Sequence, residues 1–144
     1  MNSLKEKPDF TSIAASEIFK FKHYELFRRN DGILQAHFYN EYTGEIEDAI
    51  NIVETFKILK EGHKCLVLLT VEDGASFTKE AREFVASAEV SKMVTADAFV
   101  INSMALKILM NGYLKFNKPT RPTKFFTSTE TAVTWVKEFN LSTR

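Results

Sequence analysis

The sequence predicts an α/β fold in which helices cover a mixed β-sheet of about five strands. Short apolar runs with strand character alternate along the chain with segments whose apolar residues recur every three or four positions. The first two strand-like runs are joined by Asn30-Asp31-Gly32, and Asp-Gly between such runs is a strong hairpin signal. The predicted order is β-β-α-β-α-β-α-β-α, an N-terminal hairpin followed by αβ repeats that place the later strands parallel.

The length and composition predict one globular domain. A chain of 144 residues, 44% hydrophobic and 26% charged, is large enough to bury its own core. We assign residues 21–144 to this domain and residues 1–20 to an N-terminal arm or an extra short element. Residues 13–21 allow either a short helix or the approach to the first strand.

The first half of the domain begins with strand-like runs at residues 24–29 and 33–39. A helix is predicted over residues 45–60, where the apolar positions follow the helical period and the acidic residues come first. Gly62 ends that helix. Residues 64–71 form a short continuous apolar run, which is typical of a strand covered on both faces.

The second half alternates between helices and buried strands. Thr78 is the expected N-cap of a helix over residues 79–88, and a short helical piece is expected at residues 90–94. A buried strand over residues 96–102 leads to a helix over 104–116 that Ser103 caps. After Pro119 and Pro122, we expect a strand at residues 123–126, followed by a final helix that begins with a Thr127–Glu130 capping box.

The helix predicted over residues 104–116 is apolar almost all round. Its polar stripe consists of Lys107, Asn111 and Lys115, which are four residues apart. Three interpretations remain open: core packing with neighbours on both flanks, a subunit interface, or the wall of an apolar ligand groove. The residues that we expect to make these contacts are Leu106, Met110 and Tyr113.

Charge is divided unevenly along the chain, although 19 basic and 19 acidic residues leave a net charge of zero. Residues 98–129 contain five basic side chains and no carboxylate, whereas residues 30–56 contain six carboxylates and no Lys or Arg. The neutral total argues against general nucleic-acid or membrane-surface binding. The two stretches are either solvated faces of opposite sign or complementary patches for self-association.

Polar residues stand at both ends of the apolar helix. Asn102 and Ser103 close a parallel strand and open a helix, a place where open α/β sheets bind ligands; the alternative is a turn residue and a helix cap. The segment from Lys118 through Arg121 to Lys124 either binds an anion or an acidic partner surface, or is a rigid solvated connection.

This order of elements resembles the STAS-type fold of anti-sigma-factor antagonists and their SpoIIAA-like relatives. More narrowly, residues 30–33, 78–84, 102–106 and 115–127 resemble a family of small uncharacterised STAS-like proteins typical of Bacteroidetes. The resemblance extends over residues 24–139 and implies a bacterial regulatory module that binds other proteins. In the antagonists, a Ser at the start of the helix after the central strand is phosphorylated. Here the Asp-Ser-Ser-Gly signature is absent and Lys79 stands at that position, so Thr78 and Ser76 are the possible phosphoacceptors by proximity.

No catalytic, metal-binding or cofactor motif is recognised. His23, His37 and His63 are too scattered to predict a zinc site, and Cys65 lies inside an apolar run, as a buried structural thiol does. A single Cys excludes an internal disulfide and suits a reducing compartment. With no apolar leader and no run long enough to span a membrane, we expect a cytoplasmic protein.

These observations favour a non-enzymatic, STAS-like interaction or regulatory module that forms a homodimer or binds a protein partner. The docking surface is expected on the 104–116 helix and its basic edge, opposite the acidic 45–54 segment. The alternative function is binding or sensing of a small amphipathic molecule between that helix and the sheet, near Asn102.

Overall fold

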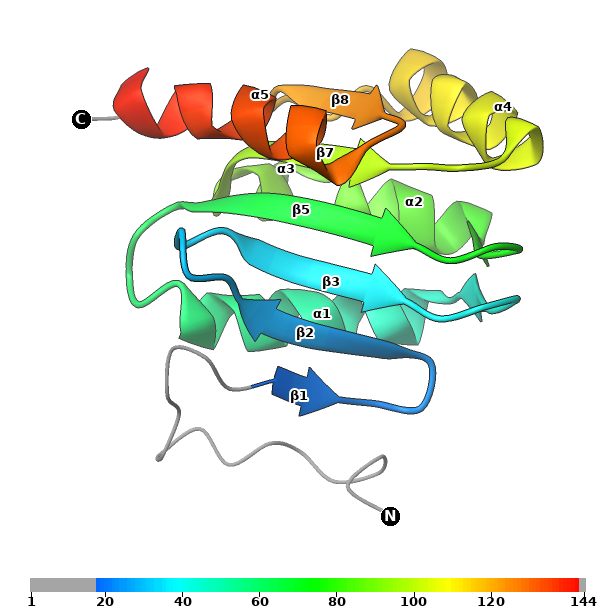
Figure 1. Ribbon diagram of the computed structural model, residues 1–144, viewed down its shortest axis with the longest axis horizontal. Helices are drawn as coiled ribbons and strands as arrows, with labels where there is room; N and C mark the ends of the chain where they lie inside the picture. The colour runs from blue at the N-terminus through cyan, green and yellow to red at the C-terminus, as the bar shows by residue number, and fades with distance from the viewer. Residues whose placement is uncertain (1–17, 143–144) are drawn as a thin grey trace.

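A mixed six-stranded sheet forms the centre of the computed structural model, which describes residues 18–142 (Figure 1). Its strand order is β1-β2-β3-β5-β7-β8, antiparallel from β1 to β3 and parallel from β3 to β8. The strands are β1 (Ile18–Lys20), β2 (Tyr24–Arg28), β3 (Leu34–Phe38), β5 (Cys65–Val71), β7 (Val94–Val100) and β8 (Thr123–Phe126). The short strands β4 (Thr43–Gly44) and β6 (Ser76–Phe77) pair with each other in a separate ladder.

The helices divide unequally between the two faces of the sheet. Buried residues of α1, α3 and α4 belong to one apolar cluster, and buried residues of α5 belong to another. Figure 1 shows α5 on the face of the sheet opposite to α1, α2 and α3. The helices are α1 (Ile46–Leu59), α2 (Lys79–Val85), α3 (Ala88–Ser91), α4 (Met104–Gly112), the π-helix η3 (Tyr113–Asn117) and α5 (Thr129–Ser142). The α/β class and the mixed sheet are therefore confirmed.

The hairpin between β2 and β3 forms where the Asp-Gly pair predicts it. Gly32 adopts a φ of +87°, which a residue with a Cβ reaches only with strain. The Asp31 carboxylate accepts a hydrogen bond from the Ile33 N–H at 3.2 Å and forms an ion pair with Arg29 at 3.1 Å. This turn aligns Arg28 with Leu34 and so places the apolar residues of both strands on one face.

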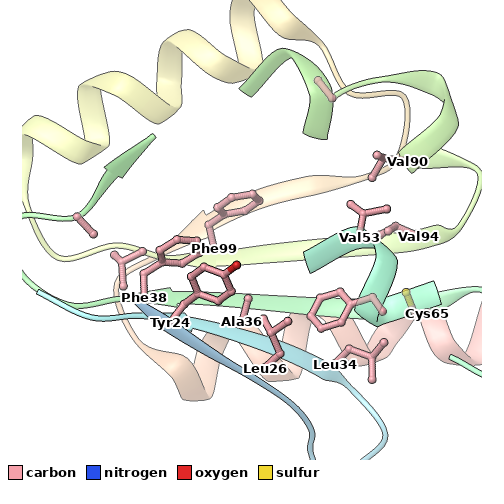
Figure 2. Packing of buried hydrophobic residues seen from close by; sticks show 14 of the residues in the cluster. Tyr24, Leu26, Leu34, Ala36, Phe38, Val53, Cys65, Val90, Val94 and Phe99 are labelled. Carbon is pink, nitrogen blue, oxygen red and sulfur yellow. The ribbon is translucent and has the colours of Figure 1, made fainter. Parts of the chain in front are cut away.

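The main core lies between the sheet and the layer that contains α1, α2, α3 and α4. Figure 2 shows Ala36, Val94 and Phe99 of the sheet in one cluster with Val53 of α1 and Val90 of α3. A smaller cluster on the other face packs Ala132 and Val136 of α5 against the sheet. Because both faces of β5 are covered, this strand reads as an apolar run interrupted by Thr70, whereas β7 also contains Thr95 and Asp97.

Several element boundaries differ from the prediction. Strand β7 begins at Val94 because Val94 pairs with Cys65 of β5, and α3 consequently ends at Ser91. The cap of α5 is Ser128, whose hydroxyl accepts from the Thr131 N–H at 3.2 Å, so the predicted Thr127–Glu130 capping box is wrong. The sheet also has more strands than predicted: residues 18–20 of the predicted arm form the edge strand β1, and residues 1–17 lie outside the described part of the chain.

Candidate functional site

The first turn of α4 begins at the carboxyl ends of β5 and β7. The Ser103 hydroxyl accepts a hydrogen bond from the Leu106 N–H at 3.1 Å, which confirms its predicted role as N-cap. The Asn102 side chain donates to Asp73 at 3.0 Å and thereby links the loops that follow these two strands. Both polar groups stabilise local structure here.

The inner face of α4 and η3 belongs to the core of the domain. Leu106, Met110 and Tyr113 are all buried and pack against the sheet and its other helices. A partner protein cannot reach these side chains while the domain is folded. Of the three interpretations of this helix, core packing is confirmed for these side chains. A subunit contact through them is wrong, because the helix turns them toward its own sheet.

The outer face of α4 carries the exposed apolar side chains instead. Met104, Ile108 and Phe116 are 70%, 66% and 77% exposed. Exposed Lys107 and Lys115 flank them, and the Lys115 ammonium lies 5.4 Å from the centre of the Phe116 ring. We call these five residues, of which Lys115 and Phe116 belong to η3, the α4 outer face.

The outer side of α1 combines exposed apolar residues with acidic ones. Ile50 and Ile58 are 41% and 45% exposed, and Glu47 and Glu54 lie beside them on the exposed side of the helix. We call these four residues the α1 outer face. Lys57 also reaches solvent there and pairs with Glu54 at 3.3 Å, an exposed ion pair of little strength.

Lys118 and Arg121 follow η3 but have different environments. Lys118 is exposed and adopts a left-handed φ of +49° at the end of η3. Arg121, in contrast, is buried, so the prediction that it binds an external acidic surface is wrong. Lys118, Thr120, Pro122 and Lys124 are exposed, as the alternative of a solvated connection predicts. The Arg121 guanidinium donates to Asp97 at 2.8 Å, to Val85 O at 2.6 Å and to Ser91 at 3.0 Å.

The pKa values in this buried cluster follow from its geometry. Burial alone would lower the pKa of Arg121, but the charge and hydrogen bond of Asp97, together with Tyr113, raise it overall. Burial also raises the pKa of the Tyr113 hydroxyl, although Arg121 opposes that shift. At neutral pH, therefore, Arg121 is charged and Tyr113 is protonated. Sequence reasoning missed Asp97; the available signal is a lone carboxylate inside an otherwise buried strand.

An apolar cavity of about 90 Å³ lies beneath α1 and α2. Its lining includes Phe38 and Phe99 of the sheet and Val53 of α1, which are among the residues drawn in Figure 2, and also Met110 and Tyr113. Asn102 does not belong to the lining. This cavity is therefore not the ligand groove predicted near Asn102, which stays a prediction, and it lies on the inner side of α4.

The two possible phosphoacceptors lie at the start of α2. The Thr78 hydroxyl accepts from the Ala81 N–H at 3.2 Å, which confirms Thr78 as the N-cap. Ser76 is half-buried in β6, where its N–H donates to Tyr42 O at 3.0 Å. Phosphorylation of either residue stays a prediction.

A polar network on the sheet face that carries α5 was not anticipated from the sequence. His37 contacts the Thr70 hydroxyl at 2.6 Å and the Glu72 carboxylate at 2.8 Å, and Gln35 donates to the same hydroxyl at 3.0 Å. The Thr70 side chain is buried, and its hydroxyl is hydrogen-bonded to both Gln35 and His37. The network therefore joins β3 to β5. Within residues 18–142, no three His, Cys, Asp or Glu side chains are grouped closely enough to hold a metal ion.

No helix of the described chain has the length and hydropathy needed to cross a bilayer. A protein from Shewanella loihica PV-4, an uncharacterised member of the DUF3478 family with a SpoIIAA-like fold, resembles this structure with a TM-score of 0.56. The match covers 78% of this chain and 91% of that one at 14% identity, and it confirms the SpoIIAA-like fold. No curated protein matches the sequence.

A family model described as a domain of unknown function, DUF7793, matches residues 27–140. The matched region begins within β2 and reaches α5, and so includes α1 and α4. The chain therefore belongs to the DUF7793 family.

Proposed function

We propose that this chain is a non-enzymatic, STAS-like interaction module that assembles with a second copy through the α4 outer face. The observation that carries the proposal is the exposure of Met104 and Ile108 on α4 and of Phe116 on η3, which follows α4 directly. Isolated apolar residues on a surface are ordinary, but a contiguous patch with a charged rim is typical of an interaction site.

The charge of the α1 outer face supports a second copy as the partner. The α4 outer face offers three apolar side chains between lysines, and the α1 outer face offers Ile50 and Ile58 beside Glu47 and Glu54. Apolar residues would meet apolar residues, and lysines would meet glutamates. Burial of each large apolar side chain contributes roughly 1.5–3 kcal/mol, and the charges set orientation.

The arrangement of the helices supports a closed, two-fold assembly. Helix α2 packs against both α1 and η3, so the two outer faces lie on either side of α2. A two-fold axis beside α2 would bring each copy's α4 to the other copy's α1 and so form the same contact twice. Closure of this kind limits assembly to a dimer.

The double variant Ile108→Asp with Phe116→Asp tests this proposal. Both residues are largely exposed in the single chain, so the fold should be retained, whereas the dimer would have to bury two carboxylates. Sedimentation velocity over a range of concentrations should show a concentration-dependent dimer for the wild type and a monomer for the variant.

Thr134→Asp provides the matched control because Thr134 is exposed on α5, on the other side of the sheet. It adds one carboxylate to a helix surface and should leave the dimer intact. A wild-type chain that stays monomeric at every concentration would contradict the proposal. So would a dimer that survives both substitutions on α4.

A further inference from the structure

Within residues 18–142, Met104 is the methionine whose side chain lies in solvent. It is 70% exposed in the first turn of α4, whereas Met93 is 8% exposed and Met110 is 2% exposed. The two buried methionines belong to the main core. A dissolved oxidant therefore reaches the thioether sulfur of Met104 much more readily than the sulfurs of Met93 and Met110.

The thiol of Cys65 does not compete with this thioether for an oxidant. Cys65 is 6% exposed, and burial raises the pKa of its thiol to about 12. The thiol also donates a hydrogen bond to Met93 O at 3.4 Å. Because oxidants attack the thiolate, a buried thiol that keeps its proton reacts slowly. The thioether of Met104 is therefore the most reactive sulfur in the described part of the folded chain.

The position of Met104 connects its oxidation to assembly. Met104 belongs to the α4 outer face, one helical turn from Lys107 and Ile108. As a thioether, its side chain is apolar and suits burial against Ile50 and Ile58 of a second copy. As a sulfoxide, it carries a polar oxygen that accepts hydrogen bonds. Water and the Lys107 ammonium can donate to that oxygen in a single chain, but an apolar contact offers no donor.

We propose that Met104 is a modification site at which peroxides control the assembly of this chain. The sulfur attacks one peroxide oxygen and the O–O bond breaks. That oxygen stays on sulfur, and the other leaves as water after it takes up the proton. Sulfur loses two electrons and the peroxide gains them. The resulting sulfoxide favours the single chain and weakens the dimer. The effect on assembly rests on the proposed function, whereas the selectivity for Met104 does not.

Selectivity is tested with ¹³C-labelled methionine methyl groups in the full chain. The protein is dilute, so that the single chain predominates, and is treated with millimolar hydrogen peroxide. Met→Leu variants assign the methyl signals. We expect the Met104 signal to convert to that of a sulfoxide while the Met93 and Met110 signals stay unchanged, because only the first side chain is exposed.

The effect on assembly is measured by sedimentation velocity after catalase has removed the peroxide. The dissociation constant of the dimer should rise at least about tenfold, because a polar oxygen loses its hydrogen bonds in the contact. Methionine sulfoxide reductases with dithiothreitol should restore the original value. In that reaction the oxygen leaves as water and the dithiol becomes a disulfide.

Met104→Leu is the matched control because it removes the sulfur and keeps an apolar side chain of similar volume. This variant retains every other methionine and Cys65. It should dimerise as the wild type does and should not respond to peroxide. Met104→Gln introduces a polar side chain of similar length at the same exposed position and should weaken the dimer without any oxidant.

Conversion of Met93 or Met110 as fast as Met104 would overturn the selectivity. An oxidised Met104 with an unchanged dissociation constant, or a Met104→Leu dimer that peroxide weakens equally, would overturn the control of assembly alone. Failure of the proposed dimer has a different signature: untreated wild type and Met104→Leu would both be monomeric at every concentration. That result would overturn the control of assembly together with the dimer.

Discussion

Cys65 shows how burial controls the chemistry of a single residue. It begins β5, is buried, and its thiol donates to Met93 O at 3.4 Å. Burial in this apolar environment raises the pKa of the thiol to about 12. Because the thiolate is the reactive species, Cys65 is inert in the folded chain at neutral pH.

The raised pKa predicts lower stability at alkaline pH. In the unfolded chain the thiol ionises near pH 9, whereas in the folded chain it keeps its proton up to about pH 12. Between these values the unfolded state binds fewer protons, so the free energy of unfolding falls as pH rises, by up to about 1.4 kcal/mol per pH unit.

Urea denaturation of the reduced protein between pH 8.5 and pH 10 measures this dependence. Cys65→Ala should lose some stability at every pH but should show a flatter decline over that range. An equally steep decline in Cys65→Ala would assign the effect to other groups.

At the scale of elements, Arg121 connects the segment before β8 to three other parts of the fold. One guanidinium bonds to the end of α2 through Val85 O, to α3 through Ser91 and to β7 through Asp97. Thr123 of β8 adds a hydroxyl hydrogen bond to the same carboxylate. The segment that contains Pro119 and Pro122 is therefore held by a buried ion pair as well as by the β7–β8 ladder.

Arg121→Met should destabilise the domain by about 3–5 kcal/mol, because it leaves Asp97 buried without its cation. The double variant Asp97→Leu with Arg121→Met removes both charges and should lose less stability than Arg121→Met alone. Chemical denaturation of the two single variants and the double variant completes the cycle. Losses that simply add would show that the two side chains contribute independently.

The elements could be predicted because each depends on local pattern. Helical periodicity indicates α1, the Asp-Gly pair indicates the hairpin, and Thr78 and Ser103 are caps that need only neighbouring N–H groups. The burial of Arg121 could not be predicted in this way. Its partner Asp97 is 24 positions earlier in the chain, and only the pairing of β7 with β8 brings them together.

The same limit applies to α4. A helix that is apolar nearly all round does not reveal which side meets the sheet, so the sequence named Leu106, Met110 and Tyr113 as contact residues. Packing turns these three inward and leaves Met104 and Ile108 exposed. The position of the cavity likewise depends on helices and strands that are distant in the sequence.

At the scale of the whole molecule, the neutral total charge conceals two surfaces of opposite sign. The α4 outer face carries lysines and the α1 outer face carries glutamates, and both contain exposed apolar residues. If these surfaces meet between two copies, reversing the charge on either one should weaken the dimer. If one chain carries a reversed α4 outer face and a second chain carries a reversed α1 outer face, a mixture of the two chains should form the dimer again.

A charge-swap experiment tests the proposed dimer most directly. One chain carries Lys107→Glu with Lys115→Glu, and the other carries Glu47→Lys with Glu54→Lys. Alone, each chain would place like charges opposite each other in both contacts. Mixed, the two chains place opposite charges in both contacts.

Sedimentation velocity at low salt measures the result, since salt screens exposed charges. We predict that each variant alone is monomeric and that an equimolar mixture forms a one-to-one heterodimer. Variants that dimerise as the wild type does, or a mixture that stays monomeric, would contradict the claim that the α4 outer face binds the α1 outer face.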